Sequence, residues 1–213
     1  MDMKLIIRFV LLIVGVSTMA LGISLSIKAC LGTSPIASPP YVLSLAFPIS
    51  VGTFVIFFNT LMVLFQMVLL REITIKQIAQ IPVCILFGYM TDFTLELVSF
   101  LNAGDYLSQW ILCILSCIVL AFGICLEVKP NLAMLPGDGA VQALAKVTNK
   151  EFGQVKPFFD VSIVLLAVVL SFGLLGHLEG VREGTIFAAI VVGFIVQYFD
   201  KIFGYKILEY LES

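Results

Sequence analysis

Leu31-Gly32-Thr33-Ser34-Pro35 interrupts an otherwise apolar sequence directly after its first long hydrophobic run. A second interruption, Leu135-Pro136-Gly137-Asp138-Gly139, follows a later hydrophobic run. Because glycine and proline break regular helices, neither segment is expected to continue the helix before it. Non-helical backbone at membrane depth persists only when it is buried in protein or lines a water-filled cavity. The two interruptions therefore decide how the surrounding chain folds.

The rest of the sequence has the composition of an integral membrane protein. Of its 213 residues, 61% are hydrophobic and 12% are charged, which is about half the charged fraction of a soluble domain. Six runs approach the roughly 20 residues that span a bilayer as a helix. These runs are residues 5–27, 52–70, 78–101, 107–128, 158–175 and 185–202. The first is too long for a signal peptide and is expected to be a retained helix.

The sequence also contains an internal repeat. A shift of 101 residues lays residues 4–70 over residues 105–171 without a gap, and after a small insertion Gly88 falls on Gly193. Apolar matches carry little weight in so apolar a chain, but matches of glycine, proline, lysine and Phe-Phe-Asn/Asp at one offset indicate a duplication. These matches are Gly22 with Gly123, Lys28 with Lys129, Pro35 with Pro136, Gly52 with Gly153, and Phe57-Phe58-Asn59 with Phe158-Phe159-Asp160.

Each repeat has the order helix, interrupted segment, helix, helix. The interrupted segments, residues 31–47 and 132–147, have room for about two or three helical turns and are expected to enter the membrane without crossing it. Three crossings per repeat would invert the second copy relative to the first, as in many transporters. The expected fold is an all-α polytopic protein with one membrane domain, composed of a first repeat (residues 1–103) and a second repeat (residues 104–213).

The placement of basic residues favours six crossings. With the N-terminus inside, ten of the twelve Lys and Arg residues lie on the cytoplasmic side, and only Lys28 and Arg182 lie outside. If both interrupted segments crossed the membrane, the split would fall to seven against five. The positive-inside rule therefore predicts six crossings and two cytoplasmic termini.

The interrupted segments are the first part of a candidate solute site. Ser34 is a good N-cap and Pro35 a good first helical residue, and the free N–H groups at such a helix start attract an anion or a carboxylate. In the second copy, the glycines permit close backbone approach and Asp138 can cap the following helix. The alternative is that both breaks only allow helices to pack. The candidate residues are Gly32, Thr33, Ser34, Gly137, Asp138 and Gly139.

Three polar residues inside the spanning runs complete the candidate site. Asn59 and Asp160 occupy equivalent repeat positions, and Asp160 is expected about one turn inside its span. Asp92 is the deepest acid of the third run, and intramembrane acids mark functional sites by default. The alternatives are a local Lys156–Asp160 pair near the interface, and a hydrogen bond from Asp92 that only joins helices.

Other function classes find less support. The sequence contains no recognisable catalytic or ATP-binding motif, so an enzyme is the least favoured class and no cofactor or metal is expected. Four of the five cysteines lie in apolar runs, where thiols usually pack as small residues. The formal net charge of -2 argues against a nucleic-acid partner.

The same residues give the chain a resemblance to the bacterial YczE/YyaS/YitT-type integral membrane proteins. The resemblance covers most of the chain and rests on residues 31–35, on Gly137-Asp138-Gly139 and on Gly52 at the start of the next helix. Members of that family often continue the Ser-Pro pair with Trp-Asp, whereas Ile36-Ala37 stands here. The first half therefore lacks the acid that Asp138 supplies in the second. The resemblance implies a location in the bacterial cytoplasmic membrane and no particular substrate.

These observations favour a carrier or channel for a small polar or anionic solute, with its site at the paired breaks near the bilayer midplane. The alternative is an accessory membrane protein that binds a partner protein or a lipid-linked molecule. A carrier needs a polar cavity that reaches toward the midplane from one side, whereas an accessory protein needs only a packed interior. The expected partners are the lipid bilayer and the small-molecule solute, and the sequence leaves a homo-oligomer open.

Overall fold

The structure is a computed structural model that describes residues 3–130, 132 and 134–204. All regular elements in this part of the chain are helical. Six helices, namely α1, α3, α4, α5, α7 and α8 with its extension, are long and apolar enough to cross a membrane. The expected all-α, multi-pass membrane protein is therefore confirmed. In chain order the elements are α1 (Met3–Ala29), η1 (Pro35–Ala37), α2 (Ser38–Ala46), α3 (Val51–Leu70), α4 (Ile75–Leu97), α5 (Tyr106–Val128), α6 (Pro136–Thr148), α7 (Phe152–Leu175), α8 (Glu183–Phe199) and η2 (Asp200–Gly204).

Local chemistry sets several of these boundaries. Ser50 Oγ accepts the Thr53 N–H at the start of α3, and Asp105 accepts the Ser108 N–H at the start of α5. Each bond satisfies a donor that has no partner inside its helix. α7 ends at Leu175 and is followed by Gly176, whose φ of 77° is the left-handed conformation that glycine adopts without steric cost.

Helix starts recur at the offset found in the sequence. Pro35 begins η1 and Pro136 begins α6, and proline fits such a position because its missing N–H would have no helical partner. Val51 begins α3 and Phe152 begins α7, again 101 residues apart. The two halves of the chain therefore form the same succession of helices through these elements.

Two helices extend further than their apolar patterns indicate. α7 begins at Phe152 rather than at residue 158, because Lys156 is paired with carboxylates and is accommodated inside the helix. Asp160 consequently lies about two turns inside α7 instead of about one. α6 has 13 residues, more than the two or three turns expected, because it continues through exposed polar residues to Thr148.

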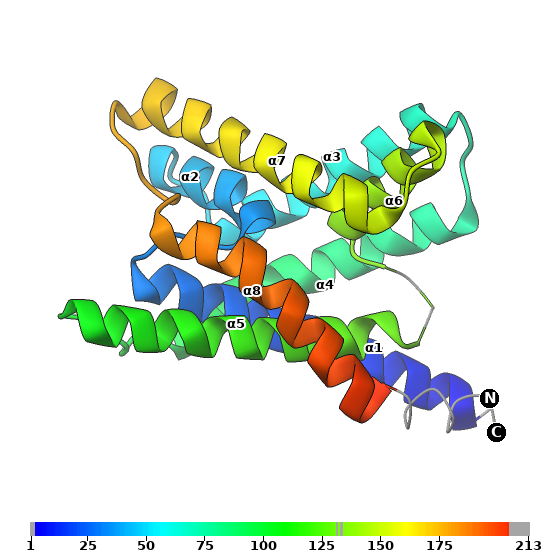
Figure 1. The fold of residues 1–213 in the computed structure, drawn as a ribbon, viewed down its shortest axis with the longest axis horizontal. Helices are drawn as coiled ribbons and strands as arrows, with labels where there is room; N and C mark the ends of the chain where they lie inside the picture. The colour runs from blue at the N-terminus through cyan, green and yellow to red at the C-terminus, as the bar shows by residue number, and fades with distance from the viewer. Residues whose placement is uncertain (1–2, 131, 133, 205–213) are drawn as a thin grey trace.

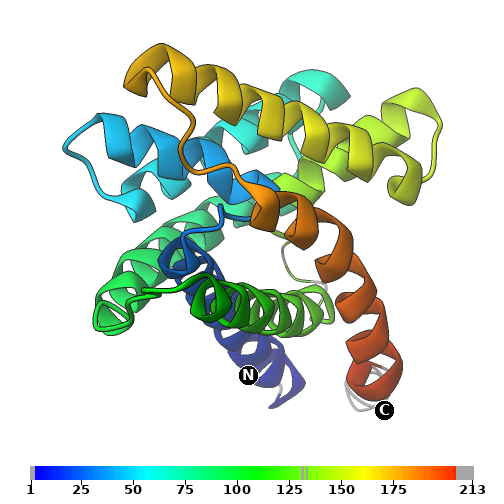
Figure 2. The ribbon, with the colours of Figure 1, turned by 60° about the vertical axis from the view of Figure 1, so that its left-hand side comes forward.

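The helices form two layers and connect at two ends. α1, α4, α5 and α8 make one layer, α2, α3, α6 and α7 make the other, and α3 packs on α4 between them (Figure 2). The α3–α4 and α6–α7 turns lie at one end with the start of α1, and the other connections between long helices lie at the opposite end (Figure 1). We call the former the basic end, because it carries most of the Lys and Arg residues. α2 runs from the interior to the opposite end, and α6 runs from the interior to the basic end.

Helices α1 and α5 pack closely and antiparallel through small residues. A Cβ added to Gly22 would lie 2.9 Å from Cβ of Leu120, and one added to Gly123 would lie 2.7 Å from the Met19 nitrogen. Glycine is therefore needed at both positions, as in other close contacts between membrane helices. A shift of 101 residues converts the Gly22–Leu120 contact into the Met19–Gly123 contact, so the interface is internally symmetric.

The two interrupted segments meet in the interior. Gly137 packs so closely on Ile36 that an added Cβ would overlap the Ile36 side chain. These two residues are counterparts at the 101-residue offset, and a contact between counterparts lies where a two-fold axis would pass. The start of α6 therefore contacts the residue that follows the first break, whereas a shared site of the two breaks near the middle of a bilayer stays a prediction.

Substitution of Gly123 by alanine should destabilise the fold. The new Cβ would meet Met19 backbone, and overpacking of this kind costs about 1–3 kcal/mol. Gly173→Ala is the matched control, since a Cβ at Gly173 meets nothing within 4 Å. Thermal unfolding in detergent should show a lower midpoint for Gly123→Ala only. Equal midpoints for the two variants would contradict the close α1–α5 packing.

Candidate functional site

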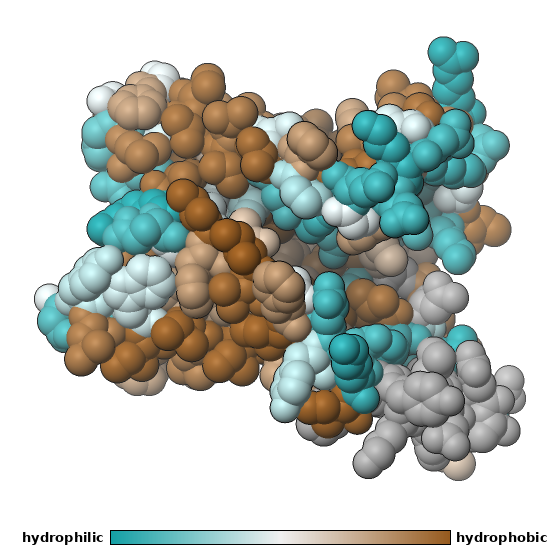
Figure 3. All heavy atoms as spheres, in the orientation of Figure 1, coloured by the Kyte–Doolittle hydropathy of each residue, from teal (hydrophilic) through white to brown (hydrophobic). Residues whose placement is uncertain are grey.

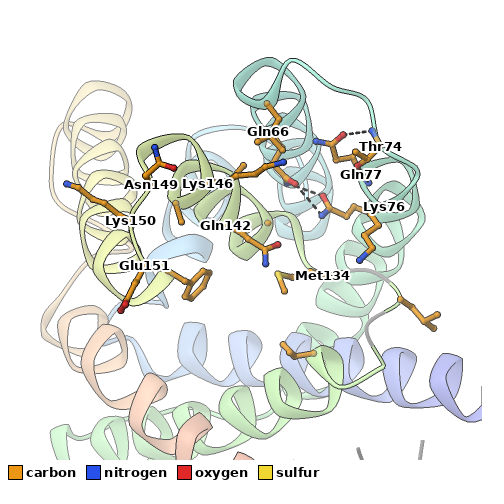
Figure 4. Close-up of a pocket in the computed structure, with 18 residues that line it drawn as sticks. Gln66, Thr74, Lys76, Gln77, Met134, Gln142, Lys146, Asn149, Lys150 and Glu151 are labelled. Carbon is orange, nitrogen blue, oxygen red and sulfur yellow. Dashed lines mark hydrogen bonds between the residues drawn. The ribbon is translucent and has the colours of Figure 1, made fainter. Parts of the chain in front are cut away.

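A cavity of about 890 Å³ lies at the basic end, between the α3–α4 turn and the α6–α7 turn (Figure 4). This volume falls within the range of about 300–1,000 Å³ that is typical of small-molecule sites. Hydrophilic side chains gather at this end of the molecule, beside a hollow in the surface (Figure 3). The polar residues that line the cavity are Gln66, Thr74, Lys76, Gln77, Gln80, Gln142, Lys146, Asn149, Lys150 and Glu151.

The charges of the lining favour an anion. Lys76 of α4, Lys146 of α6 and Lys150 of the α6–α7 turn all line the cavity and are exposed to solvent, and Glu151 is the acid among the lining residues. Lysine ammonium groups on opposite walls raise the local concentration of anions in a cleft. The cavity is therefore electrostatically suited to an anionic or strongly polar solute.

Two glutamines form the inner wall of the cavity. Gln66 of α3 donates to Oε1 of Gln80 on α4 at 3.0 Å and to the carbonyl oxygen of Pro136 at 3.1 Å. Gly139 packs against both amides, since an added Cβ would lie 2.8 Å from Oε1 of Gln66. The start of α6, which is the second interrupted segment, is thus held at the inner wall by a side chain.

Gln77 contributes a hydrogen-bond donor without a partner. Its Oε1 accepts the Thr74 N–H at 2.7 Å, and Thr74 in turn caps the start of α4. Its Nε2 is buried and has no partner among the described residues. A buried donor of this kind costs free energy when it is unsatisfied.

Asp138 and Asp160, two of the expected site residues, are joined by one lysine. Lys156 Nζ lies 3.0 Å from Oδ1 of Asp138 and 3.0 Å from Oδ1 of Asp160. The local Lys156–Asp160 pair considered from the sequence is present, and Lys156 extends it to the second break. Asp138 lies in the first turn of α6, where its charge is also favourable to the helix dipole.

The first interrupted segment is closed against the start of α8 at the opposite end. Thr33 N–H donates to the Gly180 carbonyl at 3.1 Å, and Gly184 N–H donates to the Leu31 carbonyl at 2.8 Å. Gly32 has a φ of 90°, and an added Cβ would overlap Thr185. We call this contact between residues 31–33 and residues 180–185 the outer seam.

Ser34 is the N-cap residue of η1, as the sequence indicates, but its side chain makes no capping hydrogen bond. Its Oγ is buried without a partner among the described residues. Thr33 Oγ1 and Ser38 Oγ lie 3.1 Å apart and bond to each other. The first break is therefore held mainly by backbone hydrogen bonds to Gly180, before α8, and to Gly184 in its first turn.

Asn59 and Asp92 lie away from the cavity. Asn59 Nδ2 donates to the Val55 carbonyl within α3 at 2.9 Å. Asp92 accepts the Gly52 N–H at 2.7 Å and the Ser50 hydroxyl at 2.7 Å. The carboxylate thus caps α3 from α4, which favours the interpretation that Asp92 joins helices.

The structure therefore divides the expected site residues among three places. Gly139 lines the cavity, Gly137 and Asp138 lie in the first turn of α6 beside it, and Asp160 reaches Asp138 through Lys156. Gly32, Thr33 and Ser34 belong to the outer seam and its flank. Sequence reasoning missed the glutamines and lysines of the cavity. Gln66 gave the one usable signal, because it is a buried amide in the last turns of an apolar helix.

A protein-family model matches residues 6–201, and its description is a family of unknown function, DUF6198. Because the match covers most of the sequence, the chain belongs to this family. No curated protein and no solved structure matches the chain. The resemblance to the YczE/YyaS/YitT-type proteins stays an expectation from the sequence.

Removal of the Lys156 charge should destabilise the second half. Lys156→Met would leave the Asp138 and Asp160 carboxylates without their shared ammonium group, at a cost of about 2 kcal/mol or more. The compensated variant Lys156→Met, Asp138→Asn, Asp160→Asn should recover most of that loss. Thermal unfolding in detergent measures both effects. An unchanged midpoint for Lys156→Met would show that the three-residue contact contributes little.

Proposed function

We propose that this member of the family is a membrane carrier for a small polar or anionic solute, seen in a conformation whose cavity opens to the cytoplasm. The observation that carries the proposal is the contrast between the two ends of the molecule. A basic, glutamine-lined cavity lies at one end, and the corresponding segments at the other end are joined by hydrogen bonds. The proposed location is the bacterial cytoplasmic membrane.

Six crossings with both termini in the cytoplasm are the proposed topology. The connections between long helices alternate between the two ends of the molecule (Figure 1). The basic end collects the α3–α4 and α6–α7 turns, and the positive-inside rule assigns such an end to the cytoplasm. α2 and α6 are then re-entrant helices that approach from opposite sides of the membrane.

An inverted repeat is the second part of the proposal. α1 and α5 are counterparts that run antiparallel, and their contacts are exchanged by the 101-residue offset. The contact of Ile36 with its own counterpart Gly137 is the kind expected on a pseudo-two-fold axis in the membrane plane. In such proteins, symmetry-related halves exchange conformations during transport.

The segments that correspond to the outer seam in the other half of the chain are not joined by hydrogen bonds among the described residues and line the cavity instead. The offset of 101 places Leu132 at the position of Leu31 and Met134 at that of Thr33. Leu31 and Thr33 bond to residues near the start of α8, whereas Leu132 and Met134 line the cavity opposite the start of α4. At the outer end, the segment before η1 is thus bonded to the start of α8. At the inner end, the corresponding segment before α6 is separated from the start of α4 by the cavity.

The close glycine contact between α3 and α4 also has no equivalent between α7 and α8. Gly52 of α3 and Gly88 of α4 pack so tightly that a Cβ on either would overlap the carbonyl oxygen of the other. Their counterparts, Gly153 of α7 and Gly193 of α8, have nothing within 4 Å of an added Cβ. α7 and α8 are therefore apart at the inner end, where symmetry permits a contact like that of α3 and α4.

The cavity favours a carrier over the accessory protein that the sequence left open. An accessory protein requires only a packed interior, whereas this chain has a cavity with polar walls. The closed outer seam favours a carrier over a channel, because a channel needs a continuous path when it conducts. Any active transport would draw on an ion gradient or a partner ATPase.

Anions should bind in the cavity and stabilise the protein. A thermal-shift screen of the purified protein against small anions, amino acids and vitamins should identify a compound that raises the unfolding midpoint. The variant Lys146→Gln, Lys150→Gln should weaken its binding about tenfold or more, through the loss of two attractive charges. Lys4→Gln, which changes an exposed charge on α1, is the control. Equal affinity in all three proteins would exclude this cavity as the site.

Thiol labelling should confirm the orientation and the closed seam. In a Cys30→Ser background, which removes the exposed cysteine, Gln142→Cys should react with an impermeant reagent from the cytoplasmic side. Asn102→Cys should react from the outside, and Thr33→Cys should be protected because Thr33 is buried in the outer seam. Labelling of Gln142→Cys from the outside would refute the proposed topology.

A further inference from the structure

The start of α7 corresponds, in the repeat, to a helix start that is held from a neighbouring helix. At the start of α3, Asp92 accepts the Gly52 N–H and the Ser50 hydroxyl, each at 2.7 Å. At the start of α7, 101 residues later, Glu151 is the N-cap residue and its side chain makes no capping hydrogen bond. The Gly153 N–H has no partner among the described residues. The start of α3 is thus capped by a side chain from α4, whereas the start of α7 has no such cap.

Gln197 of α8 occupies the position of Asp92. It lies one turn after Gly193, as Asp92 lies one turn after Gly88, and the repeat aligns Gly193 with Gly88. The Gln197 side chain is exposed and makes no hydrogen bond with the described residues. A polar amide on an apolar membrane helix is stabilised when a second helix supplies its partner. The counterpart position on α7 has the groups to do so.

The two pairs of counterparts are complementary, with donor and acceptor exchanged. In the first half, the Ser50 hydroxyl donates and the Asp92 carboxylate accepts. In the second half, the Gln197 amide can donate to the Glu151 carboxylate, and its oxygen can accept the Gly153 N–H. An acid at residue 197 would instead face Glu151 as a like charge. The exchange therefore keeps one carboxylate in each pair and preserves the possible hydrogen bonds.

The backbone around these residues leaves room for the contact. Gly153 and Gly193 are exposed and have nothing within 4 Å of an added Cβ, so α7 and α8 can approach each other as α3 and α4 do. The side chains of Gln197 and Glu151 are longer than those of their counterparts, so they reach each other without a closer approach of the helices. Glu151 also lines the cavity. A contact between α7 and α8 at this point would therefore lie at the mouth of the cavity.

We propose that Glu151 and Gln197 form an inner lock, in which Gln197 donates to Glu151 and caps the start of α7 when the cavity closes to the cytoplasm. The proposal rests on the carrier function proposed above. In the closed state α7 packs on α8 through Gly153 and Gly193, and the inner lock holds this contact as Asp92 holds the outer one. Glu151 thus has a role in the conformational change that is separate from contact with a solute.

Disulfide trapping of Gly153→Cys with Gly193→Cys tests the closed state. In the Cys30→Ser background, which removes the exposed cysteine, oxidation in liposomes should join the two cysteines, because trapping captures even a state populated at about 1%. Ser50→Cys with Asp92→Cys is the positive control, since these residues are already in contact. If the control pair forms a disulfide and the pair on α7 and α8 never does, the proposal is overturned.

Substitutions in the inner lock test the hydrogen bond itself. With Gly153→Cys and Gly193→Cys in place, Gln197→Asp should slow disulfide formation at least about fivefold, because it brings two carboxylates together. The further substitution Glu151→Ser, which copies the pair of the first half, should restore the rate. Both positions are exposed, so the variants should fold. A rate that Gln197→Asp leaves unchanged, or that Glu151→Ser fails to restore, would refute the inner lock.

The anion screen separates this proposal from the carrier function. If an anion raises the unfolding midpoint but the cysteines on α7 and α8 never join, the inner lock is wrong while the cavity still binds a solute. If disulfide formation follows the expected order of rates but no anion binds, the inner lock stands and the carrier function fails.

Discussion

Backbone groups at a chain break that is shielded from water must find hydrogen-bond partners within the protein, and the rest of this structure follows from how the two breaks find them. The first break bonds to other backbone, through Thr33 to Gly180 and Leu31 to Gly184. The second break is held by side chains, through Glu127 to Leu135 and Gln66 to Pro136. Lipid offers no replacement for any of these partners. Backbone partners thus hold the first break, and side-chain partners hold the second.

This difference in partners accompanies a difference between the two ends of the molecule. The outer end is closed by the outer seam and by the Gly52–Gly88 contact, which Asp92 reinforces as a cap on α3. At the inner end, Gly153 and Gly193 are apart, and Gln197 stands at the position of Asp92. In the proposed inverted repeat the two ends can exchange these roles, which would make the cavity and the closed seam related features. Solute access to the breaks would then alternate between the two sides of the membrane.

Much of this architecture could be predicted from the sequence, because prolines and glycines at a repeated spacing determine where helices begin. Pro35 and Pro136 predict η1 and α6, and apolar length predicts the six long helices. The cavity residues could not be predicted in the same way. Lys146 and Lys150 have the pattern of ordinary surface lysines, and local sequence does not reveal which end of a symmetric molecule is open. Asp92 was placed in the candidate site because it is an acid inside a span, but capping of a neighbouring helix depends on tertiary packing that periodicity does not encode.

The distance between α7 and α8 at the inner end tests the central claim most directly. Spin labels at the exposed positions Gln154 of α7 and Phe194 of α8 leave Gly153 and Gly193 free to meet. Pulsed electron paramagnetic resonance in liposomes should resolve two distance populations. The account predicts that the shorter one gains weight when a stabilising solute is added. A single long distance under every condition would contradict a carrier whose halves exchange conformations.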